Sequence, residues 1–331
     1  MNNRIVLIVI YFGVFPLYFQ SWLDCAKHQN RIDFYIVTDT DLSVYDIPEN
    51  VYVFSWSFIE VKKKFQELFP YSICLNTPYK LTDYKPVYGK LFENYIGDYD
   101  WWGYIDIDII FGNLNKFLRY YINEDYQRIG KNGHFSIFKN TEENRLLYLK
   151  DIPITECYKS NEVYRNNHYF SYDDIGGGKF RFGISYGMEQ LGLKIADISA
   201  YISDVHINKR DFSSLQCNIN VQHEVFEYNQ GELFELHKNE SSIVVSEIMY
   251  AHFQKRSLES HNQDRNHFYI IPNEIVDIYD MENDFRHVSN DIENKIWWNK
   301  LKMNNIKMRL KTGALFWLIK DNFILNFHRY M

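Results

Sequence analysis

The chain has 331 residues, of which 46% are hydrophobic and 18% aromatic, whereas Gly and Pro together contribute only 22. This composition excludes collagen-like, low-complexity and disordered classes, and it supplies enough apolar residues for a large core. The net charge of −7 argues against general nucleic-acid binding through a basic surface, so we expect no nucleic-acid partner. The length fits roughly two domains, or one large α/β domain with an appendage.

The amino-terminal region begins with a long uncharged run, residues 5–23. Its first part is continuous and β-branched, which predicts a strand over residues 4–12 that is buried on both faces. A helix is expected from Pro16 to about His28, with proline in its first turn. A signal anchor is the alternative for this run, but Gly13 and Pro16 interrupt it, and we favour the strand.

Strands and helices continue to alternate along the chain. We expect strands over residues 33–37, 51–54, 101–105, 133–138 and 242–252, and helices over 57–68 and 86–95. Residues 168–187 have a loop-like composition, with three consecutive glycines, Gly176–Gly178, at the centre. This alternation predicts an α/β fold in which helices cover a mostly parallel sheet.

Charge is distributed unevenly. Residues 295–331 contain eight Lys or Arg and one acid, a net charge of +7, whereas the remaining 294 residues carry −14. The same segment is rich in large apolar side chains: Trp297, Trp298, Leu315, Phe316, Trp317, Leu318, Phe323 and Phe327. A cationic helix with aromatic anchors is typical of peripheral membrane contact, which we expect through this segment. The alternative is a helix packed on the acidic body with solvated lysines.

One short segment carries the strongest chemical signal. Residues 100–112 read DWWGYIDIDIIFG, so Asp106 and Asp108 form an Asp-x-Asp pair at the end of an apolar strand. Alternate strand residues share a face, and open α/β sheets bind ligands at the carboxyl ends of their strands. Two carboxylates there are costly unless a cation meets them, and Mg²⁺ or Mn²⁺ would leave positions open for substrate phosphates. The alternative is a strand end with two solvated acids.

The chain resembles bacterial glycosyltransferases encoded in polysaccharide-biosynthesis loci. The matching segments are FGVFPLYF at 12–19, VTD at 37–39, YKLTDYKP at 79–86, GYIDIDIIFG at 103–112, GHFSIFKNT at 133–141 and HFQKR at 252–256. The resemblance covers most of residues 4–256 and implies the GT-A fold, in which a Rossmann-like nucleotide-binding half is merged with an acceptor-binding half. We therefore expect a domain over residues 1–270 and a helical, basic and aromatic appendage over 271–331.

The resemblance also implies roles for particular residues. Asp108 and Asp106 would bind the metal, Asp106 with a further contact to the nucleotide, and His252 would complete the metal site as the late histidine of metal-dependent GT-A enzymes. Its His-x-x-Lys spacing is similar to that of glycogenin-like transferases, which would pair Lys255 with the donor diphosphate. The remaining positions that it places near the donor or acceptor are Asp83, Lys85, His134 and Asn140.

Other candidates rest on position alone. Asp39 follows the second strand and is a candidate acceptor for a nucleobase or ribose hydrogen bond, although Asp also favours turns by itself. Asp173 and Asp174 precede the three glycines, and either is a candidate general base if the enzyme inverts configuration. Asp83 has the alternative of capping a helix, and His134 that of a buried structural histidine.

Together these observations predict a metal-dependent glycosyltransferase. The donor would be a nucleotide-diphosphate sugar, with a UDP-sugar as first choice, and the acceptor a glycan or lipid-linked glycan of a surface polysaccharide such as capsule or O-antigen. The four cysteines are far apart with no Cys-x-x-Cys pair, which fits a reduced cytoplasmic compartment, with peripheral contact to the inner membrane. A nucleotidyltransferase on a related fold and a non-catalytic glycan-binding or assembly subunit remain as alternatives.

Overall fold

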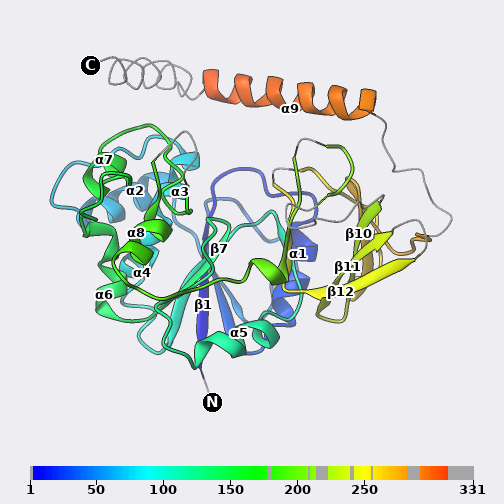
Figure 1. Ribbon diagram of the computed structural model, residues 1–331, viewed down its shortest axis with the longest axis horizontal. Helices are drawn as coiled ribbons and strands as arrows, with labels where there is room; N and C mark the ends of the chain where they lie inside the picture. The colour runs from blue at the N-terminus through cyan, green and yellow to red at the C-terminus, as the bar shows by residue number, and fades with distance from the viewer. Residues whose placement is uncertain are drawn as a thin grey trace.

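The core of the protein is a mixed sheet with helices on both sides (Figure 1). The computed structural model describes residues 3–176, 181–207, 209–213, 223–238, 242–254, 256–281 and 291–311. Seven described strands form the sheet in the order β3-β2-β1-β4-β7-β6-β8. Their bounds are β1 (Ile5–Ile10), β2 (Ile32–Val37), β3 (Val51–Phe54), β4 (Trp101–Ile105), β6 (Arg128–Ile129), β7 (Phe135–Lys139) and β8 (Ile195–Ala196). The first four strands in this order are parallel, whereas β7 is antiparallel to β4. The α/β prediction is confirmed.

Strand β1 is buried on both faces, as predicted. Its side chains point alternately into two separate hydrophobic cores. Leu7 packs in one core and Ile8 in the other. The first core lies against α1 (Phe19–Lys27) and α5 (Leu114–Ile122). The second lies against the helices on the other face of the sheet, α2 (Phe58–Glu67), α3 (Leu81–Tyr84), α4 (Tyr88–Leu91), α6 (Glu142–Arg145), α7 (Ser160–Tyr164) and α8 (Ile184–Gln190) (Figure 1). Both faces of β1 are thus covered by other parts of the protein.

A second, antiparallel sheet packs on the first core. Its order is β12-β11-β10-β15-β16-β14. The bounds are β10 (His223–Asn229), β11 (Glu232–Lys238), β12 (Ile243–Ile248), β14 (Glu259–Ser260), β15 (His267–Ile271) and β16 (Glu274–Val276). The sequence analysis missed this sheet apart from β12. The predicted domain boundary at residue 270 falls inside β15, which pairs with β16, so the sheet continues to Val276.

A small three-stranded sheet joins the two larger ones. It consists of β5 (Ile109–Phe111), β13 (Tyr250–His252) and β9 (Ile202–Asp204) in the order β5-β13-β9. The single strand predicted over residues 242–252 is therefore two strands, because the chain leaves the antiparallel sheet at Met249 and continues as β13 beside β5. This change of partner brings the end of β13 next to the end of β4.

The single helix predicted over residues 86–95 is not present. A series of four short helical segments covers residues 78–91 instead. These are η1 (Pro78–Lys80), α3, η2 (Lys85–Val87) and α4, and the chain leaves α4 at Phe92. Pro86 has no N–H to donate, so it fits only the first turn of a helical segment. It therefore lies in the first turn of η2, where the helical path is interrupted after α3. The other 3-10 turns are η3 (Leu147–Leu149) and η4 (Ser199–Tyr201). The predicted helix over 57–68 is confirmed as α2, which Ser57 and Glu60 begin with a reciprocal capping box.

The centre of the sheet has no room for a side chain at Gly103 in β4. A Cβ atom there would lie 2.2 Å from the Ser136 carbonyl oxygen on β7. We expect Gly103→Ala to lower the free energy of unfolding by about 1–3 kcal/mol, because the two strands would have to separate. Gly97→Ala is the matched control, since a Cβ at Gly97 meets nothing within 4 Å. Urea denaturation of both variants checks this, and equal stabilities would contradict it.

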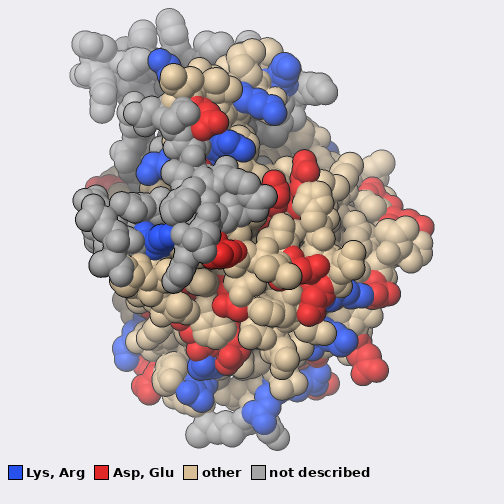
Figure 2. Space-filling model, turned by 90° about the vertical axis from the view of Figure 1, so that its right-hand side faces the viewer, with Lys and Arg blue, Asp and Glu red and all other residues tan. Residues whose placement is uncertain are grey.

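Helix α9 (Asp291–Lys311) follows the antiparallel sheet and lies across the top of the view in Figure 1. It confirms the helical character predicted for the carboxyl-terminal appendage. In Figure 2, Lys and Arg side chains predominate at the top of the molecule, where α9 lies, and charges of both signs are mixed on the body below. Among the described residues, no helix combines the length and apolar character needed to cross a membrane.

Candidate functional site: a carboxylate-histidine pocket at the end of β4

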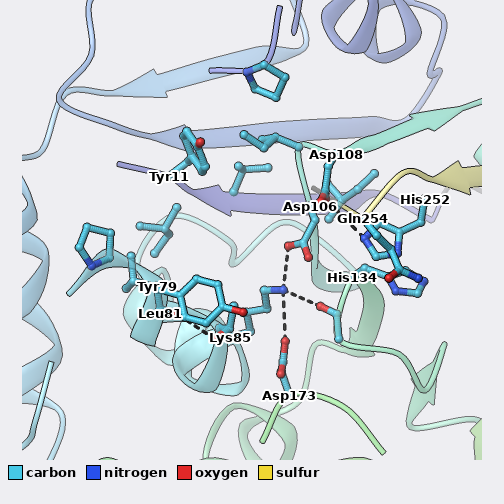
Figure 3. Close-up of a pocket in the computed structure, with 18 of the residues that line it drawn as sticks. Tyr11, Tyr79, Leu81, Lys85, Asp106, Asp108, His134, Asp173, His252 and Gln254 are labelled. Carbon is cyan, nitrogen blue, oxygen red and sulfur yellow. Dashed lines mark hydrogen bonds and ion pairs between the residues drawn. The ribbon is translucent and has the colours of Figure 1, made fainter. Parts of the chain in front are cut away.

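A pocket of about 770 Å³ opens where the parallel strands β1 and β4 end. Its wall includes the aromatic residues Tyr11, Phe12, Tyr79 and Tyr169, which follow β1 or come from the turns and loops on the opposite side. Its polar lining residues include Lys85, Asp106, Asp108, His134, Asp173, Asp174, His252 and Gln254. Most of the residues selected from the sequence therefore line a single cavity (Figure 3).

Strand pairing brings Asp108 and His252 together. Asp108 directly precedes β5, and in the register of β5 with β13 the next residue, Ile109, is opposite His252. The Phe253 backbone N–H donates to the Asp108 carbonyl at 2.9 Å, which fixes the two strand ends. The His252 Nε2 atom then lies 3.5 Å from Asp108 Oδ1. One potential ligand atom from each of Asp106, Asp108 and His252 lies within 4.8 Å of the others.

A third strand orients the histidine. Asp204 ends β9, opposite His252 in the parallel register of β9 with β13, and its Oδ1 lies 2.8 Å from His252 Nδ1. Burial acts to lower the pKa of His252, but the Asp108 and Asp204 carboxylates outweigh it and raise the pKa to about 10. With Nδ1 held by Asp204, the Nε2 atom is directed at Asp108. This is the carboxylate–histidine arrangement that commonly orients a metal-binding imidazole.

The donor set fits a divalent cation. Two carboxylates and one imidazole suit Mn²⁺, and the carboxylate oxygens also suit Mg²⁺. All three side chains line the pocket, so coordination positions would remain accessible from it. His134, Asp204 and His252 form another close set, but Asp204 does not line the pocket and its carboxylate is already engaged by His252 and Gln254. The set formed by Asp106, Asp108 and His252 is therefore the better candidate.

We expect Asp204→Asn to weaken Mn²⁺ binding about 10- to 100-fold, because the amide orients and polarises His252 less well than a carboxylate. Isothermal titration with Mn²⁺ checks this. Asp98→Asn, at an exposed position, is the control and should bind Mn²⁺ like the parent. Equal affinity of the Asp204→Asn variant and the parent would show that His252 is not a ligand.

Lys85 is a buried cation at the floor of the pocket. Its Nζ atom lies 2.7 Å from Asp106 Oδ1 and 3.2 Å from Asp173 Oδ2, and it donates to the Gly133 carbonyl at 2.6 Å (Figure 3). Burial acts to lower the pKa of Lys85, but the two carboxylates raise it well above its usual value. The ammonium group therefore remains charged and holds Asp106 in place beside Asp108.

Asp173 and Asp174 have different partners: Asp173 pairs with Lys85, and Asp174 accepts a hydrogen bond from the Ile175 backbone N–H. Burial raises the pKa of Asp173 to about 7, although Lys85 opposes this rise. Burial also raises the pKa of Asp174, against a hydrogen bond from the Ile175 backbone N–H. Both line the pocket. A carboxyl group with a pKa near 7 is suited to accept a proton at physiological pH.

His134 lies at the side of the pocket, next to the candidate metal ligands. Its Nε2 atom lies 2.9 Å from the Tyr250 hydroxyl, and its ring centroid is 4.2 Å from that of His252. Burial and the neighbouring His252 lower the pKa of His134 well below its usual value. His134 is therefore neutral, and it is both a pocket residue and a hydrogen-bonded structural histidine.

Four predicted site residues are not brought to the pocket by the described structure. Asp39 is exposed after β2 and does not line the cavity. Asn140 lies at the opposite end of β4, where its amide donates to the Ile96 and Tyr99 carbonyls, so its role is structural. Asp83 is fully buried and is discussed next. Lys255 lies outside the described residues.

Asp83 neither contacts the pocket nor caps a helix. Its carboxylate pairs with Lys80 at 2.8 Å and accepts hydrogen bonds from the Phe170 and Tyr172 backbone N–H groups. Because Tyr172 immediately precedes Asp173, this ion pair positions the segment that delivers Asp173 to Lys85. The positioning role of Asp83 and Lys80 was not predicted from the sequence, and Asp204 was not among the predicted site residues. No local pattern distinguishes Asp204 from a strand-end acid, and only its pairing with β13 reveals it.

Comparison with known proteins adds a family but no activity. A family model described as "Family of unknown function (DUF6625)" matches residues 7–279. The matched range contains every pocket residue named above and ends before α9. No curated protein matches the chain.

Proposed function

Because the chain belongs to the DUF6625 family, whose function is unknown, its activity has to be inferred from the site, and we propose that it is a metal-dependent glycosyltransferase. The donor would be a nucleotide-diphosphate sugar, and a UDP-sugar is the first candidate. The acceptor would be a glycan or lipid-linked glycan of a surface polysaccharide, handled on the cytoplasmic side. The GT-A fold is part of this proposal.

One observation carries the proposal: the convergence of Asp106, Asp108 and His252 at the carboxyl end of β4 in an open pocket. The carboxyl edge of a parallel sheet is where α/β proteins bind nucleotides. The protein is acidic, and Lys85, a buried cation in the pocket floor, is already engaged by two carboxylates. Arg256 is buried and lines the pocket as well, but its guanidinium already donates to the Arg210 and Lys209 backbone carbonyls. A diphosphate in this pocket would therefore need a bridging cation for its own charge. The arrangement supports a metal–diphosphate site better than a site for a neutral ligand.

Different residues of the pocket would bind the metal, position a carboxylate and stack against the donor. Asp106, Asp108 and His252 would hold Mn²⁺ or Mg²⁺, which when bound supplies positive charge to the departing diphosphate. Lys85 fixes the Asp106 carboxylate and opposes the rise in its pKa that burial causes. The aromatic wall, with Tyr79 and Tyr169 at a ring separation of 5.0 Å, offers stacking surfaces for a base or a sugar ring. The pocket thus combines a charged floor with an apolar wall.

Asp173 is the better candidate for a general base, and this predicts a pH dependence. Its pKa of about 7 means that the carboxylate is increasingly populated as the pH rises through that value. We expect kcat/KM to rise about tenfold per pH unit below pH 7 and to level off above it. Asp173→Asn should abolish this rise, whereas Asp174→Asn should preserve it. Initial rates between pH 5 and about 9 check the profile, and an unchanged profile in Asp173→Asn would assign the base elsewhere.

The proposal is tested by a thermal-shift screen of UDP-, GDP- and CMP-linked sugars, each with and without Mn²⁺. A ligand that binds only the folded state raises the melting temperature, and saturation at about 100 times Kd adds about 2.7 kcal/mol. We expect the largest shift with a UDP-sugar in the presence of Mn²⁺. The absence of a shift with every compound would overturn the proposal. Release of pyrophosphate from a nucleoside triphosphate and a sugar 1-phosphate, without sugar transfer from any nucleotide-sugar, would indicate a nucleotidyltransferase instead.

A further inference from the structure

Helix α9 presents an apolar face, interrupted by Asn299, to the outside. Five of its described residues are 42–71% exposed: Ile292, Ile296, Met303, Ile306 and Leu310. With about 3.6 residues per turn, these five positions lie within about 40° of one line along the helix. An apolar stripe that is exposed over five helical turns of the described helix marks an interaction surface, and we call it the α9 stripe.

The opposite face of α9 fastens the helix to the body. The Trp297 indole N–H donates to the Ile207 carbonyl at 3.1 Å, and the Arg210 backbone N–H donates to Asn294 Oδ1 at 2.7 Å. The Arg256 guanidinium lies 5.4 Å from the centre of the Trp297 ring. These contacts turn Trp297 inward, so it is not the membrane anchor that the sequence predicted. They also fix the α9 stripe on the outside.

Lysines border the α9 stripe on both sides. At about 100° per residue, Lys295 and Lys302 lie along one edge, and Lys300 and Lys307 lie along the other. All four are exposed. The acid nearest to them on the described helix, Glu293, points to Arg210 at 3.7 Å. The stripe is therefore apolar along its centre and cationic at both edges, which matches the acyl boundary and the headgroups of an anionic lipid surface.

We propose that α9 docks the protein on an anionic lipid surface. The α9 stripe enters the boundary between headgroups and acyl chains, and the lysines extend their aliphatic stems over it while their ammonium groups contact headgroup phosphates. The charge distribution favours this orientation, because residues 295–311 contain six Lys or Arg and no acid, whereas the first 294 residues carry −14. An anionic surface therefore attracts the α9 side and repels the body.

Docking through α9 would hold the pocket near the lipid surface, on the body side of the helix. Ile207 and Arg256, which contact Trp297 of α9, also line the pocket. Val14 and Leu17, on the loop after β1 at the same edge of the sheet, are exposed apolar residues, and Leu17 lines the pocket as well. Combined with the proposed transferase activity, on which this last step alone rests, the geometry favours a lipid-linked acceptor that reaches the pocket from the bilayer.

The test is co-sedimentation of the full chain with vesicles of phosphatidylcholine alone or with added phosphatidylglycerol. We expect binding to the anionic vesicles, weakened by salt. The double variant Ile296→Glu/Ile306→Glu should bind at least about 10-fold more weakly because it places charges in the α9 stripe. The double variant Lys300→Glu/Lys302→Glu should lose at least about 20-fold in affinity for anionic vesicles. The control Val44→Glu/Ile59→Glu changes two apolar positions elsewhere that are even more exposed, and it should bind like the parent.

The outcomes separate docking from catalysis. The Mn²⁺-dependent thermal shift with a nucleotide-sugar should be the same in all these variants, because none of them lies in the pocket. Equal loss of vesicle binding in the stripe and control variants would overturn the proposal, as would equal binding to neutral and anionic vesicles. A dimer in light scattering that Ile296→Glu/Ile306→Glu dissolves, without vesicle binding, would show instead that a second copy covers the stripe.

Discussion

Asp108→Asn should lower sugar-transfer turnover by at least about 100-fold and should abolish saturable Mn²⁺ binding. The substitution keeps the size of the side chain but removes the negative charge at the centre of the candidate metal site, where Asp108 lies between Asp106 and His252. It also removes one of the two carboxylates that raise the pKa of His252. Titration calorimetry with Mn²⁺ and a sugar-transfer assay measure the two effects separately.

Asp98→Asn again serves as the control, because it makes the same chemical change at an exposed position outside the pocket. A thermal melt of both variants verifies that the fold is intact. Full turnover in Asp108→Asn would contradict the metal-dependent mechanism. Full biological function without any measurable turnover would point to the non-catalytic glycan-binding subunit that the sequence leaves open.

Lys85→Met should lower the free energy of unfolding by about 3–5 kcal/mol, since it leaves Asp106 and Asp173 at the pocket floor without their shared cation. For a chain of this size we expect a fall in melting temperature of about 6 °C or more. Methionine retains most of the volume of lysine, so the loss reports on charge rather than on a cavity. Differential scanning calorimetry measures it.

A second substitution sharpens this test. Adding Asp173→Asn to Lys85→Met removes one of the two unpaired carboxylates and should restore part of the lost stability. Lys63→Met, at an exposed position in α2, is the matched control and should change stability by no more than about 0.5 kcal/mol. If Lys85→Met melts like the parent, Lys85 does not stabilise charged carboxylates.

Local elements were predictable where one strand or helix carries its own signal. Strands β3 and β4 have the predicted bounds, and α2 has the capping box that its Ser-x-x-Glu sequence provides. The antiparallel sheet was not predictable in the same way. Its strands β10 and β11 carry polar residues on both faces. They become strands through their pairing with each other, through packing of Phe226 and Leu233 on the first core, and through packing of Val225 and Leu236 in a separate cluster on the other face.

In the candidate site too, some residues were predictable from the local sequence and others were not. The Asp-x-Asp pair was visible because it follows an apolar strand, and Lys85 was named through the resemblance of its segment. The sequence could not reveal that Asn140 lies at the far end of β4 or that Asp83 is buried behind the pocket. In both cases the residue type fits a binding role and a structural role equally well, and only its neighbours distinguish them.

The sequence by itself determined the α/β class, the central buried strand and the strand end at which two carboxylates lie, because each depends on residues that are close along the chain. Only the tertiary structure decided that Asp204 and His252, from β9 and β13, meet Asp108, that Lys85 bridges Asp106 to Asp173, and that α9 turns its aliphatic stripe outward. These arrangements join segments up to 144 residues apart, as between Asp108 and His252, and strand register and packing fix them. No local spacing encodes such contacts, because the energy that selects them comes from burial shared by the whole sheet.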